Sequence, residues 1–428
     1  MGKTRLGSAI HNQQAANAFA KALIEDMRKE YTPKQNEYIL YSAKDFPQLN
    51  LDHVGIGMNN IFNQLLKIHE RVIIVGSDLP KISQAYILHT FQQLKKHPLI
   101  ITPTIDKGYG LIGMNRYVDV FTQIQNFDSR TSGYNLVEET DLLAEQHNVL
   151  LYKQPVSYDI DYPFDVARTR RFILGQEKKF PQVFRVLKQF PELYNQSVSI
   201  IIPVYNERNI ILNSLNQIKE LHNGEAIDWI FVDGGSKDDT KKIIRNFIDT
   251  HGQYQIRLLS ATGGRGGALA YRAKQAYGEI LAFVHADTVI PKDFSERIQH
   301  ALKNKPNVIG GAFTLEFDNS AWQYTGIAIY SKFRSKIFRI YHGDQAMFIK
   351  REALKKIGGV PNIPLMEDAL LSKKMKKIGN TTLLKKKVTS STRRFKKNGF
   401  FLSVFLYFFL KTAFFLGIPP KYLKKIYS

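Results

Sequence analysis

The chain of 428 residues contains no cysteine at all. Without cysteine there is no disulfide bond, no thiolate nucleophile and no zinc site built on thiolates. A protein without disulfides fits a reducing cytosol. The first residues also lack the basic and then apolar pattern of a secretory signal peptide. We therefore expect a cytoplasmic protein.

Acidic residues are scarce in the last part of the chain. Residues 331–428 hold 23 basic and 4 acidic residues, a net charge of +19, whereas residues 1–174 hold 19 basic and 18 acidic residues. Such an excess indicates either a solvated basic surface or an anionic partner, such as nucleic acid, acidic lipid headgroups or a phosphorylated substrate. Because no nucleic-acid-binding module is recognisable, we expect no nucleic acid partner.

Long apolar stretches without a charged residue are also scarce in this chain. Residues 400–418 are rich in phenylalanine and approach spanning length, but Lys411 lies near their middle. A phenylalanine-rich helix beside basic residues is typical of binding to an anionic membrane surface. A buried closing helix and a true membrane span are the alternatives. We expect peripheral association with the inner face of the membrane.

Apolar runs and helical patterns alternate along the chain in two α/β blocks. Residues 1–174 form the first block, 175–196 a short helical linker, and 197–428 the second block. This alternation predicts mainly parallel sheets with helices on both faces. The expected strands are Arg71–Gly76, Leu99–Pro103, Val149–Tyr152, Ser197–Val204, Ala226–Val232, Gln255–Leu259 and Ile280–Val284.

Carboxylates follow the strands of the second block in order. Asp233 and Asp287 each close an apolar run, and the pair Glu367-Asp368 opens a helical stretch. Carboxylates at the carboxyl ends of parallel strands indicate a site for a nucleotide, a metal ion or both. Gly234 and its neighbours allow close backbone approach, and the helix that follows can receive a phosphate at its N-terminus.

Four ordered motifs in residues 197–428 resemble the family 2 glycosyltransferases, whose fold is called GT-A. The motifs are Ile201-Ile202-Pro203-Val204-Tyr205-Asn206-Glu207, Asp233-Gly234-Gly235-Ser236-Lys237-Asp238-Asp239-Thr240, His285-Ala286-Asp287 and Glu367-Asp368. The resemblance implies an inverting transfer of a sugar from a nucleotide-sugar donor to an acceptor that the sequence does not name. It also implies a Mg²⁺ or Mn²⁺ cofactor.

The resemblance also assigns roles. Asp233 would contact the base of the nucleotide, Asp287 with His285 would hold the metal ion, and Asp368 would deprotonate the acceptor with Glu367 beside it. His285 replaces the first acid of the metal motif, so we expect modest metal affinity. The remaining residues expected to bind the nucleotide sugar are Pro203, Tyr205, Asn206, Glu207, Gly234, Ser236, Asp239, Arg265, Asp344, Arg393 and Arg394.

Further motifs resemble a subgroup found in radical-SAM and selenoprotein clusters and linked with arsenosugar biosynthesis. They include Gly343-Asp344-Gln345-Ala346, Ser390-Ser391-Thr392-Arg393-Arg394 and Leu416-Gly417-Ile418-Pro419-Pro420. The loop at Arg265 departs from the subgroup because it lacks a glutamine and an asparagine. This departure leaves the donor and the acceptor open.

Four motifs follow in order in the first block: Lys3-Thr4-Arg5-Leu6, Asp78 with Pro80, Asp106–Gly113 and Asp159-Ile160-Asp161-Tyr162. They resemble the partner family of these clusters, a GT-A-like domain related to sugar and molybdopterin nucleotidyltransferases. The candidate site residues of this block are Lys3, Arg5, Asp78, Asp106 and Asp161. The family's first strand is absent, Lys107 replaces a glycine, and Gly57 stands where an arginine is usual. Either the true start lies upstream or the domain is degenerate, and we expect impaired catalysis.

The sequence therefore predicts two tandem GT-A-like α/β domains with mainly parallel sheets and a C-terminal apolar helix. The second domain is expected to be a metal-dependent glycosyltransferase. In one alternative both domains are active, as a nucleotidyltransferase and a glycosyltransferase. In the other the protein is a non-catalytic scaffold that binds sugar nucleotides or membranes.

Overall fold

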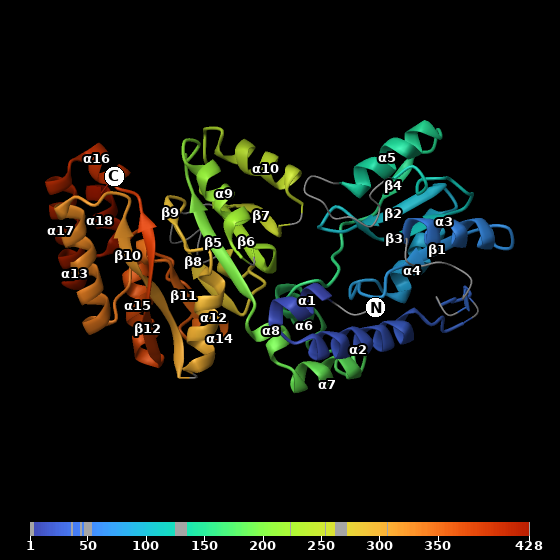
Figure 1. Ribbon diagram of the computed structural model, residues 1–428, viewed down its shortest axis with the longest axis horizontal. Coiled ribbons are helices and arrows are strands. Elements are labelled where there is room, and N and C mark those ends of the chain that lie inside the picture. Colours follow the sequence, from blue (N-terminus) through green and yellow to red (C-terminus); the bar gives the residue numbers. More distant parts are fainter. Residues whose placement is uncertain are drawn as a thin grey trace. The chain divides into compact units, whose positions relative to one another are not determined.

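The structure, a computed structural model, describes residues 4–35, 37–42, 45–46, 54–124, 135–222, 224–252, 254–261, 272–305 and 307–427. The chain divides into two compact units (Figure 1). The N-terminal unit contains Met1–Leu193 with Asp249–Gln253, and the C-terminal unit contains Tyr194–Ile248 with Tyr254–Ser428. Each unit has its own sheet and its own buried apolar core.

The sheet of the N-terminal unit has four strands in the order β1-β3-β2-β4. The pairs β1–β3 and β2–β3 are antiparallel, and only β2–β4 is parallel. The prediction of a mainly parallel sheet is therefore wrong here. The reason is the short turn 104–108, which makes β2 and β3 a hairpin, whereas parallel neighbours need a long crossover. The strands are β1 (Val72–Val75), β2 (Leu99–Pro103), β3 (Tyr109–Met114) and β4 (Leu151–Lys153).

Helices of the N-terminal unit extend beyond the first predicted block. The predicted linker contains α7, whose residue Val183 donates its backbone N–H to Asp26 of α2 at 2.9 Å. The helix α7 thus packs within the N-terminal unit. The helices are α1 (Thr4–Ile10), α2 (Gln13–Tyr31), α3 (Val54–Leu65), α4 (Gln84–Gln93), α5 (Leu136–Gln146), α6 (Pro163–Ile173), α7 (Pro181–Gln189) and, across the boundary of the units, α8 (Glu192–Asn195).

The sheet of the C-terminal unit has eight strands in the order β7-β6-β5-β8-β11-β10-β12-β9. Neighbours from β7 to β8 and the pair β10–β12 are parallel, whereas β11 is antiparallel to both neighbours and β9 is antiparallel to β12. The sheet is therefore mixed. Its strands are β5 (Val198–Val204), β6 (Ile227–Asp233), β7 (Ile256–Ser260), β8 (Ile280–Phe283), β9 (Thr288–Val289), β10 (Val308–Phe317), β11 (Met347–Lys350) and β12 (Asn380–Ser390).

Apolar side chains from both faces of this sheet are buried, which explains the continuous apolar runs of β5 and β6. The strand Ile227–Asp233 is buried at every position. The helical elements are α9 (Ile211–Glu220), η2 (Gly224–Ala226), α10 (Thr240–Thr250), α12 (Phe294–Asn304), α13 (Trp322–Phe338), η3 (Gly343–Gln345), α14 (Arg351–Lys356), α15 (Glu367–Ile378), α16 (Arg393–Asn398), α17 (Phe400–Phe415) and α18 (Pro420–Tyr427).

The last helices close over the start of α15. Leu410 and Ala413 of α17 pack with Leu423 of α18 against Met366 and Ala369. The other side of α17 is exposed. Among the described helices, none is both long and apolar enough to cross a membrane.

Candidate functional site

Three predicted site residues follow neighbouring parallel strands of the C-terminal unit. Strand β5 pairs with β6 on one side and β8 on the other. Glu207 follows β5, Asp233 ends β6, and Asp287 follows β8. The carboxyl ends of parallel strands meet at one edge of a sheet, where open α/β sheets bind their ligands. The register therefore gathers these carboxylates at one edge.

The loops after β5 and β6 are joined by crossing hydrogen bonds. The N–H of Asn206 donates to Ser236 Oγ at 2.9 Å, and the N–H of Lys237 donates to Asn206 Oδ1 at 2.9 Å. Asn206 has a φ of +53°, in the left-handed region that asparagine tolerates better than most residues. The asparagine thus fixes one loop against the other.

Asp238 also links the loops after β5 and β6, although the sequence prediction selected Asp239. Asp238 Oδ2 accepts the N–H of Arg208 at 3.2 Å, and its Oδ1 accepts the N–H of Thr240 at 3.1 Å. The Thr240 hydroxyl accepts the N–H of Glu207 at 2.8 Å. Asp239 is exposed. The spacing of the motif, in which the second acid lies five residues after Asp233, was the signal that pointed to Asp238.

Asp233 is buried, with 1% of its surface exposed. Its carboxylate accepts the N–H of Gly235 at 3.1 Å and the N–H of Ser236 at 3.1 and 3.2 Å. Gly235 has a φ of +95°, which glycine adopts without strain. Asp233 therefore shapes the turn in which the exposed Gly234 lies.

Arg393 connects two of these loops. Its Nη2 lies 2.8 Å from Glu207 Oε2 and 4.0 Å from Asp287 Oδ2. Asp318 holds the segment before Arg393, because its Oδ1 accepts both the N–H and the hydroxyl of Thr392, at 2.8 and 2.7 Å. The structure thus brings together a cation and two acids that the sequence placed in separate motifs.

The pair Glu367-Asp368 lies in the first turn of α15, where the helix dipole favours acids. Glu367 is buried, whereas the side chain of Asp368 is 22% exposed. Asp368 Oδ2 accepts the N–H of Gly343 at 2.8 Å and lies 3.3 Å from His342 Nδ1. These contacts orient the carboxylate. The sequence analysis did not find His342, which lies next to a motif it did find.

The other predicted residues differ in their exposure. Tyr205 and Arg394 are exposed, while Pro203, His285 and Asp344 are partly buried. Ser236 is buried between the loops after β5 and β6, where its hydroxyl accepts the N–H of Asn206. Arg265 and Lys3 lie outside the described residues.

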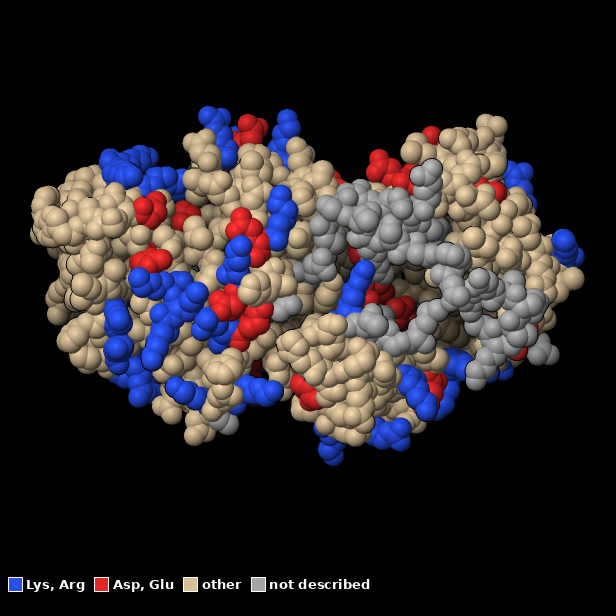
Figure 2. Space-filling view, in the orientation of Figure 1, with Lys and Arg blue, Asp and Glu red and all other residues tan. Residues whose placement is uncertain are grey.

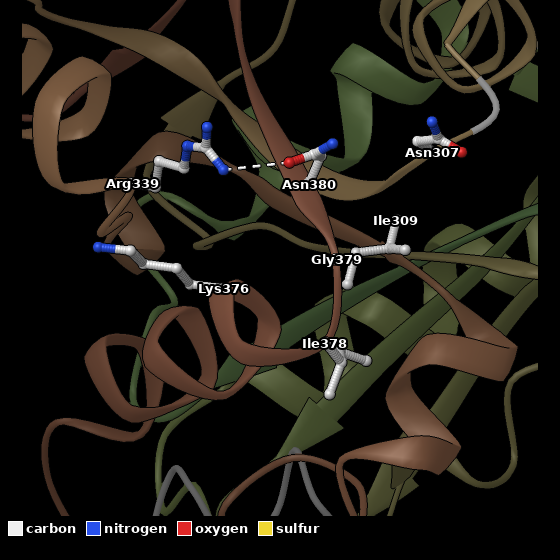
Figure 3. A pocket seen from close by; sticks show the side chains of 7 residues that line it. All are labelled: Asn307, Ile309, Arg339, Lys376, Ile378, Gly379 and Asn380. Carbon is white, nitrogen blue, oxygen red and sulfur yellow. Dashed lines mark hydrogen bonds between the residues drawn. The ribbon is translucent and has the colours of Figure 1, made fainter.

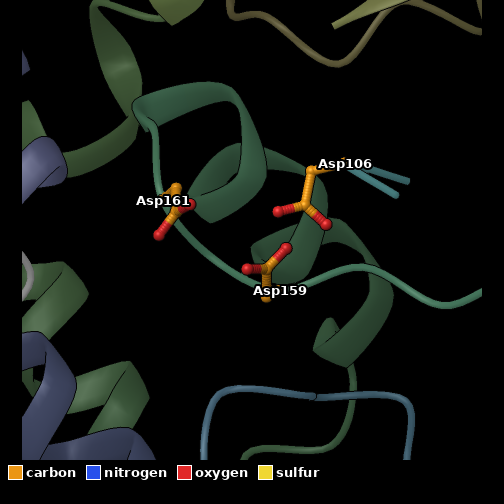
Figure 4. A group of neighbouring side chains, drawn as sticks. All are labelled: Asp106, Asp159 and Asp161. Atoms are coloured by element: carbon orange, nitrogen blue, oxygen red, sulfur yellow. The ribbon is translucent and has the colours of Figure 1, made fainter. Parts of the chain in front are cut away.

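The N-terminal unit contains a separate group of carboxylates. One ligand atom from each of Asp106, Asp159 and Asp161 lies within 4.8 Å of the others, and the three side chains draw together (Figure 4). Arg5 Nη1 lies 3.0 Å from Asp161 Oδ2. Burial and the charges of Asp159 and Asp161 raise the pKa of the neighbouring Asp165 well above its usual value. Among the described residues, this is the group of three acids that could hold a metal ion.

Two features of the N-terminal unit bear on its predicted motifs. Lys107 has a φ of +70°, a backbone conformation that favours glycine. Glycine is the residue that Lys107 replaces relative to the family that this block resembles. Asp78 is partly buried and lies outside the group of three acids. Three of the four described candidates of this unit, Arg5, Asp106 and Asp161, thus come together.

The C-terminal unit also has an open pocket, which lies away from the carboxylates at its sheet edge. It is lined by Asn307, Ile309, Arg339, Lys376, Ile378, Gly379 and Asn380 (Figure 3). Arg339 Nη1 donates to Asn380 Oδ1 at 3.2 Å. Lys376 and Asp368 are separated by about 12 Å along α15, at 1.5 Å per residue. The pocket therefore opens at the starts of β10 and β12, away from the sheet edge with the carboxylates.

Basic side chains gather on the surface of the C-terminal unit. Figure 2 shows lysine and arginine grouped over its lower part. Exposed lysines occur at residues 373, 376 and 377 in α15 and at 385–387 in β12. The exposed face of α17 is apolar instead, with Phe401, Leu402 and Phe405 at least 63% exposed.

Both units match models of known families. Residues 199–358 match the model described as glycosyl transferase family 2. Residues 13–126 match the model described as an uncharacterized protein conserved in bacteria, DUF2064. The first match covers β5 to β11 and includes the motifs up to Asp344.

Similar proteins include named glycosyltransferases. The chain is 26% identical over 170 residues to glycosyltransferase AglE of Haloferax volcanii, covering 39% of this chain and 56% of the relative. It is 30% identical over 151 residues to a dolichyl-phosphate beta-glucosyltransferase of Dictyostelium discoideum, covering 32% and 45%. The chain thus spans about half the length of these curated relatives.

Two solved structures are similar over part of the chain. S. aureus TarS residues 1–349 in complex with UDP-GlcNAc has a TM-score of 0.38 and 20% identity, covering 46% of this chain and 58% of that one. Mannosyltransferase PcManGT from Pyrobaculum calidifontis in complex with GDP-Man and Mn²⁺ has a TM-score of 0.38 and 21% identity, covering 53% and 68%. From the matches of the two family models, this chain contains a glycosyl transferase family 2 domain in its C-terminal unit and a DUF2064 domain in its N-terminal unit.

Proposed function

We propose that the C-terminal unit is an inverting, metal-dependent glycosyltransferase of GT-A-like fold that moves a sugar from a nucleotide-sugar donor to an acceptor hydroxyl. The family 2 match and the named glycosyltransferase relatives support the reaction class. The observation that carries the proposal is the gathering of Glu207, Asp287 and Arg393 within salt-bridge distance at one sheet edge.

In the proposed reaction Asp368 takes the proton of the acceptor hydroxyl. The hydroxyl oxygen then forms a bond to the anomeric carbon of the sugar. The bond from that carbon to the donor's diphosphate breaks on the opposite face, and the nucleoside diphosphate leaves with the bonding electrons. Contacts from Gly343 and His342 keep the base oriented for this step. Attack from the opposite face inverts the anomeric centre.

The acids at the sheet edge fit a Mg²⁺ or Mn²⁺ ion that is shared with the donor. Asp287, with His285 two residues before it, would hold the ion, and the diphosphate would supply further oxygens. When bound, such an ion neutralises charge on the departing diphosphate. Arg393 stands beside Asp287 and offers a planar fork of donors that suits phosphate oxygens.

Donor binding tests this proposal most directly. Calorimetry with UDP-, GDP- and CDP-sugars in the presence of Mn²⁺ should detect one nucleotide class on the wild type. Asp287→Ala should abolish the metal-dependent part of this binding. Asp293→Ala is the matched control, because Asp293 pairs with Arg297 on the surface of α12. Folded wild-type protein that binds none of these donors would contradict the proposal and favour a scaffold.

We propose further that the protein works in the cytoplasm at the inner face of an anionic membrane. The exposed phenylalanines of α17 and the exposed Lys396 and Lys397 of the preceding helix α16 support this location. The resemblance to the arsenosugar-linked subgroup stays a prediction from the motifs, as do the sugar and the acceptor.

A second candidate activity belongs to the N-terminal unit. Asp106, Asp159 and Asp161 favour a divalent cation there, which agrees with a fold related to nucleotidyltransferases. We propose that this unit has GT-A-like ancestry and keeps a cation site with impaired catalysis. Release of pyrophosphate from a sugar phosphate and a nucleoside triphosphate, lost in Asp161→Asn, would show instead that both units are active.

A further inference from the structure

Lys411 lies in the middle of the apolar helix α17, yet its charge interacts with that of the proposed base, Asp368. Its Nζ lies 5.6 Å from the ring centre of Tyr407 and 5.9 Å from that of Tyr330. The ring of Tyr407 lies 5.7 Å from the ring of His342, whose Nδ1 is 3.3 Å from Asp368. A continuous row of contacts therefore leads from the base to the ammonium group.

A second cation, Arg334, contacts the same row of side chains. Arg334 is 5% exposed and donates to Tyr407 Oη at 3.2 Å and to Gln345 Oε1 at 2.8 Å. Its guanidinium is thus held by hydrogen bonds to neutral groups. Two cations stand close together here, and the acids near them, Asp344 and Asp368, are at the proposed reaction centre.

The partly buried ammonium group of Lys411 lies against aromatic rings. Among the described residues it forms no hydrogen bond and no ion pair, and its contacts are the faces of two tyrosine rings. Burial and the charge of Arg334 lower the pKa of Lys411 to about 8, against the opposing influence of Asp368 and Asp344. A half-buried cation beside another cation is costly, and a bound anion would offset this cost further than the two carboxylates already do.

We propose that Lys411 binds a phosphate group of the acceptor, and that the acceptor's hydroxyl then reaches Asp368. This inference rests on the proposed function for the role of Asp368, but the binding of phosphate does not. The tyrosine rings supply walls, and the ammonium supplies three donors for phosphate oxygens. The phosphate could belong to a soluble metabolite or to a lipid headgroup.

The test uses the full chain and two variants. Lys411→Gln removes the charge and should fold at least as well as the wild type, since it removes a poorly solvated ammonium; thermal unfolding checks this. Lys421→Gln is the control, because exposed Lys421 on α18 also lies over a tyrosine ring, at 4.9 Å from that of Tyr422. Calorimetry with inorganic phosphate probes the soluble source. Vesicles of phosphatidylcholine with or without phosphatidic acid probe the lipid source.

Lys411→Gln should weaken the binding of at least one probe by about tenfold, as expected for a charge-assisted contact to phosphate. Loss with inorganic phosphate assigns a soluble acceptor, and loss with phosphatidic acid vesicles alone assigns a lipid acceptor. If Lys411→Gln and Lys421→Gln bind both probes equally well, the proposal is wrong. Donor binding on the same samples tests the proposed function separately.

The affinity should also depend on pH. Well below pH 8 the ammonium is charged, so the anion is held. As the pH rises through about 8, the empty site loses its proton and the affinity falls. The other charged groups that face Lys411 are Arg334, Asp344 and Asp368, and burial raises the pKa of Tyr407. Lys411→Gln should remove the part of the pH dependence that phosphate's own titration, near pH 7, does not explain. A wild-type profile identical to that of the variant would also overturn the proposal.

Discussion

At the scale of single residues, the proposed base depends on contacts that the motif does not contain. Asp368 accepts an N–H from Gly343, which is 25 residues away in the chain, and His342 stands beside the same oxygen. Met366, two residues earlier, has a φ of +65°, a conformation that costs energy for a residue of this type. Such strain is typical of sites in which a side chain must be held in a particular place.

We expect Asp368→Asn to lower the release of nucleoside diphosphate by about a hundredfold or more, because an amide cannot accept the acceptor's proton. Donor affinity should remain near that of the wild type, since Glu207, Asp287 and Arg393, which we propose to hold the donor and its metal ion, lie at the sheet edge. The assay adds a cell extract as the source of acceptor. Glu352→Gln, at an exposed acid in the first turn of α14, is the control. Equal losses of binding and turnover would remove Asp368 from the role of base.

At the scale of elements, α17 has two different sides. Leu410 and Ala413 pack against the start of α15, so deletion of the helix would disturb the proposed base as well as any membrane contact. Phe401, Phe405 and Phe409 are 79%, 68% and 46% exposed and follow one another at helical spacing. Substitution of the exposed side alone therefore separates membrane binding from folding.

The triple variant Phe401→Ser, Phe405→Ser, Phe409→Ser should lose most of its binding to phosphatidylserine vesicles. The reason is that each phenylalanine side chain that moves from water into the bilayer contributes about 1.5–3 kcal/mol. Its melting temperature should stay close to that of the wild type. Leu410→Ala is the opposite control, because loss of a buried leucine destabilises a core by about 2–5 kcal/mol. Vesicle sedimentation that is unchanged in the triple variant would refute the membrane proposal.

At the scale of the whole molecule, two compact units with separate cores make up the chain. Units of this kind are expected to unfold separately unless a large interface couples them. The family matches fall in different units, and so do the two groups of acids. The activity of one unit can thus be examined while the other serves as an internal reference.

Scanning calorimetry should show two unfolding transitions. A bound nucleotide sugar with Mn²⁺, at about a hundred times its Kd, should stabilise one transition by about 2.7 kcal/mol. The melting temperature of that transition should rise by several degrees, and the other should move only if Mn²⁺ binds to Asp106, Asp159 and Asp161. The variant Asp161→Asn identifies that contribution. A single transition that moves as a whole would mean that the units are coupled.

Much of the architecture was predictable because it is encoded locally. The buried apolar runs predicted Leu99–Pro103 with the bounds that the structure has, and predicted β5, β6, β7 and β8 to within one residue at each end. Strands joined by short helical crossovers usually become parallel neighbours. For that reason the sequence also indicated that Asp233 and Asp287 belong to one edge of a sheet.

The sequence by itself determined the order of strands and helices in the first half of the C-terminal unit and the types of residue available for chemistry. Only the tertiary structure decided that Arg393 meets Glu207, that His342 meets Asp368, and that Lys411 turns inward from an apolar helix. It also decided that β2 and β3 form a hairpin. Periodicity reports which face of an element is apolar, but contacts between residues far apart in the chain depend on how whole elements pack.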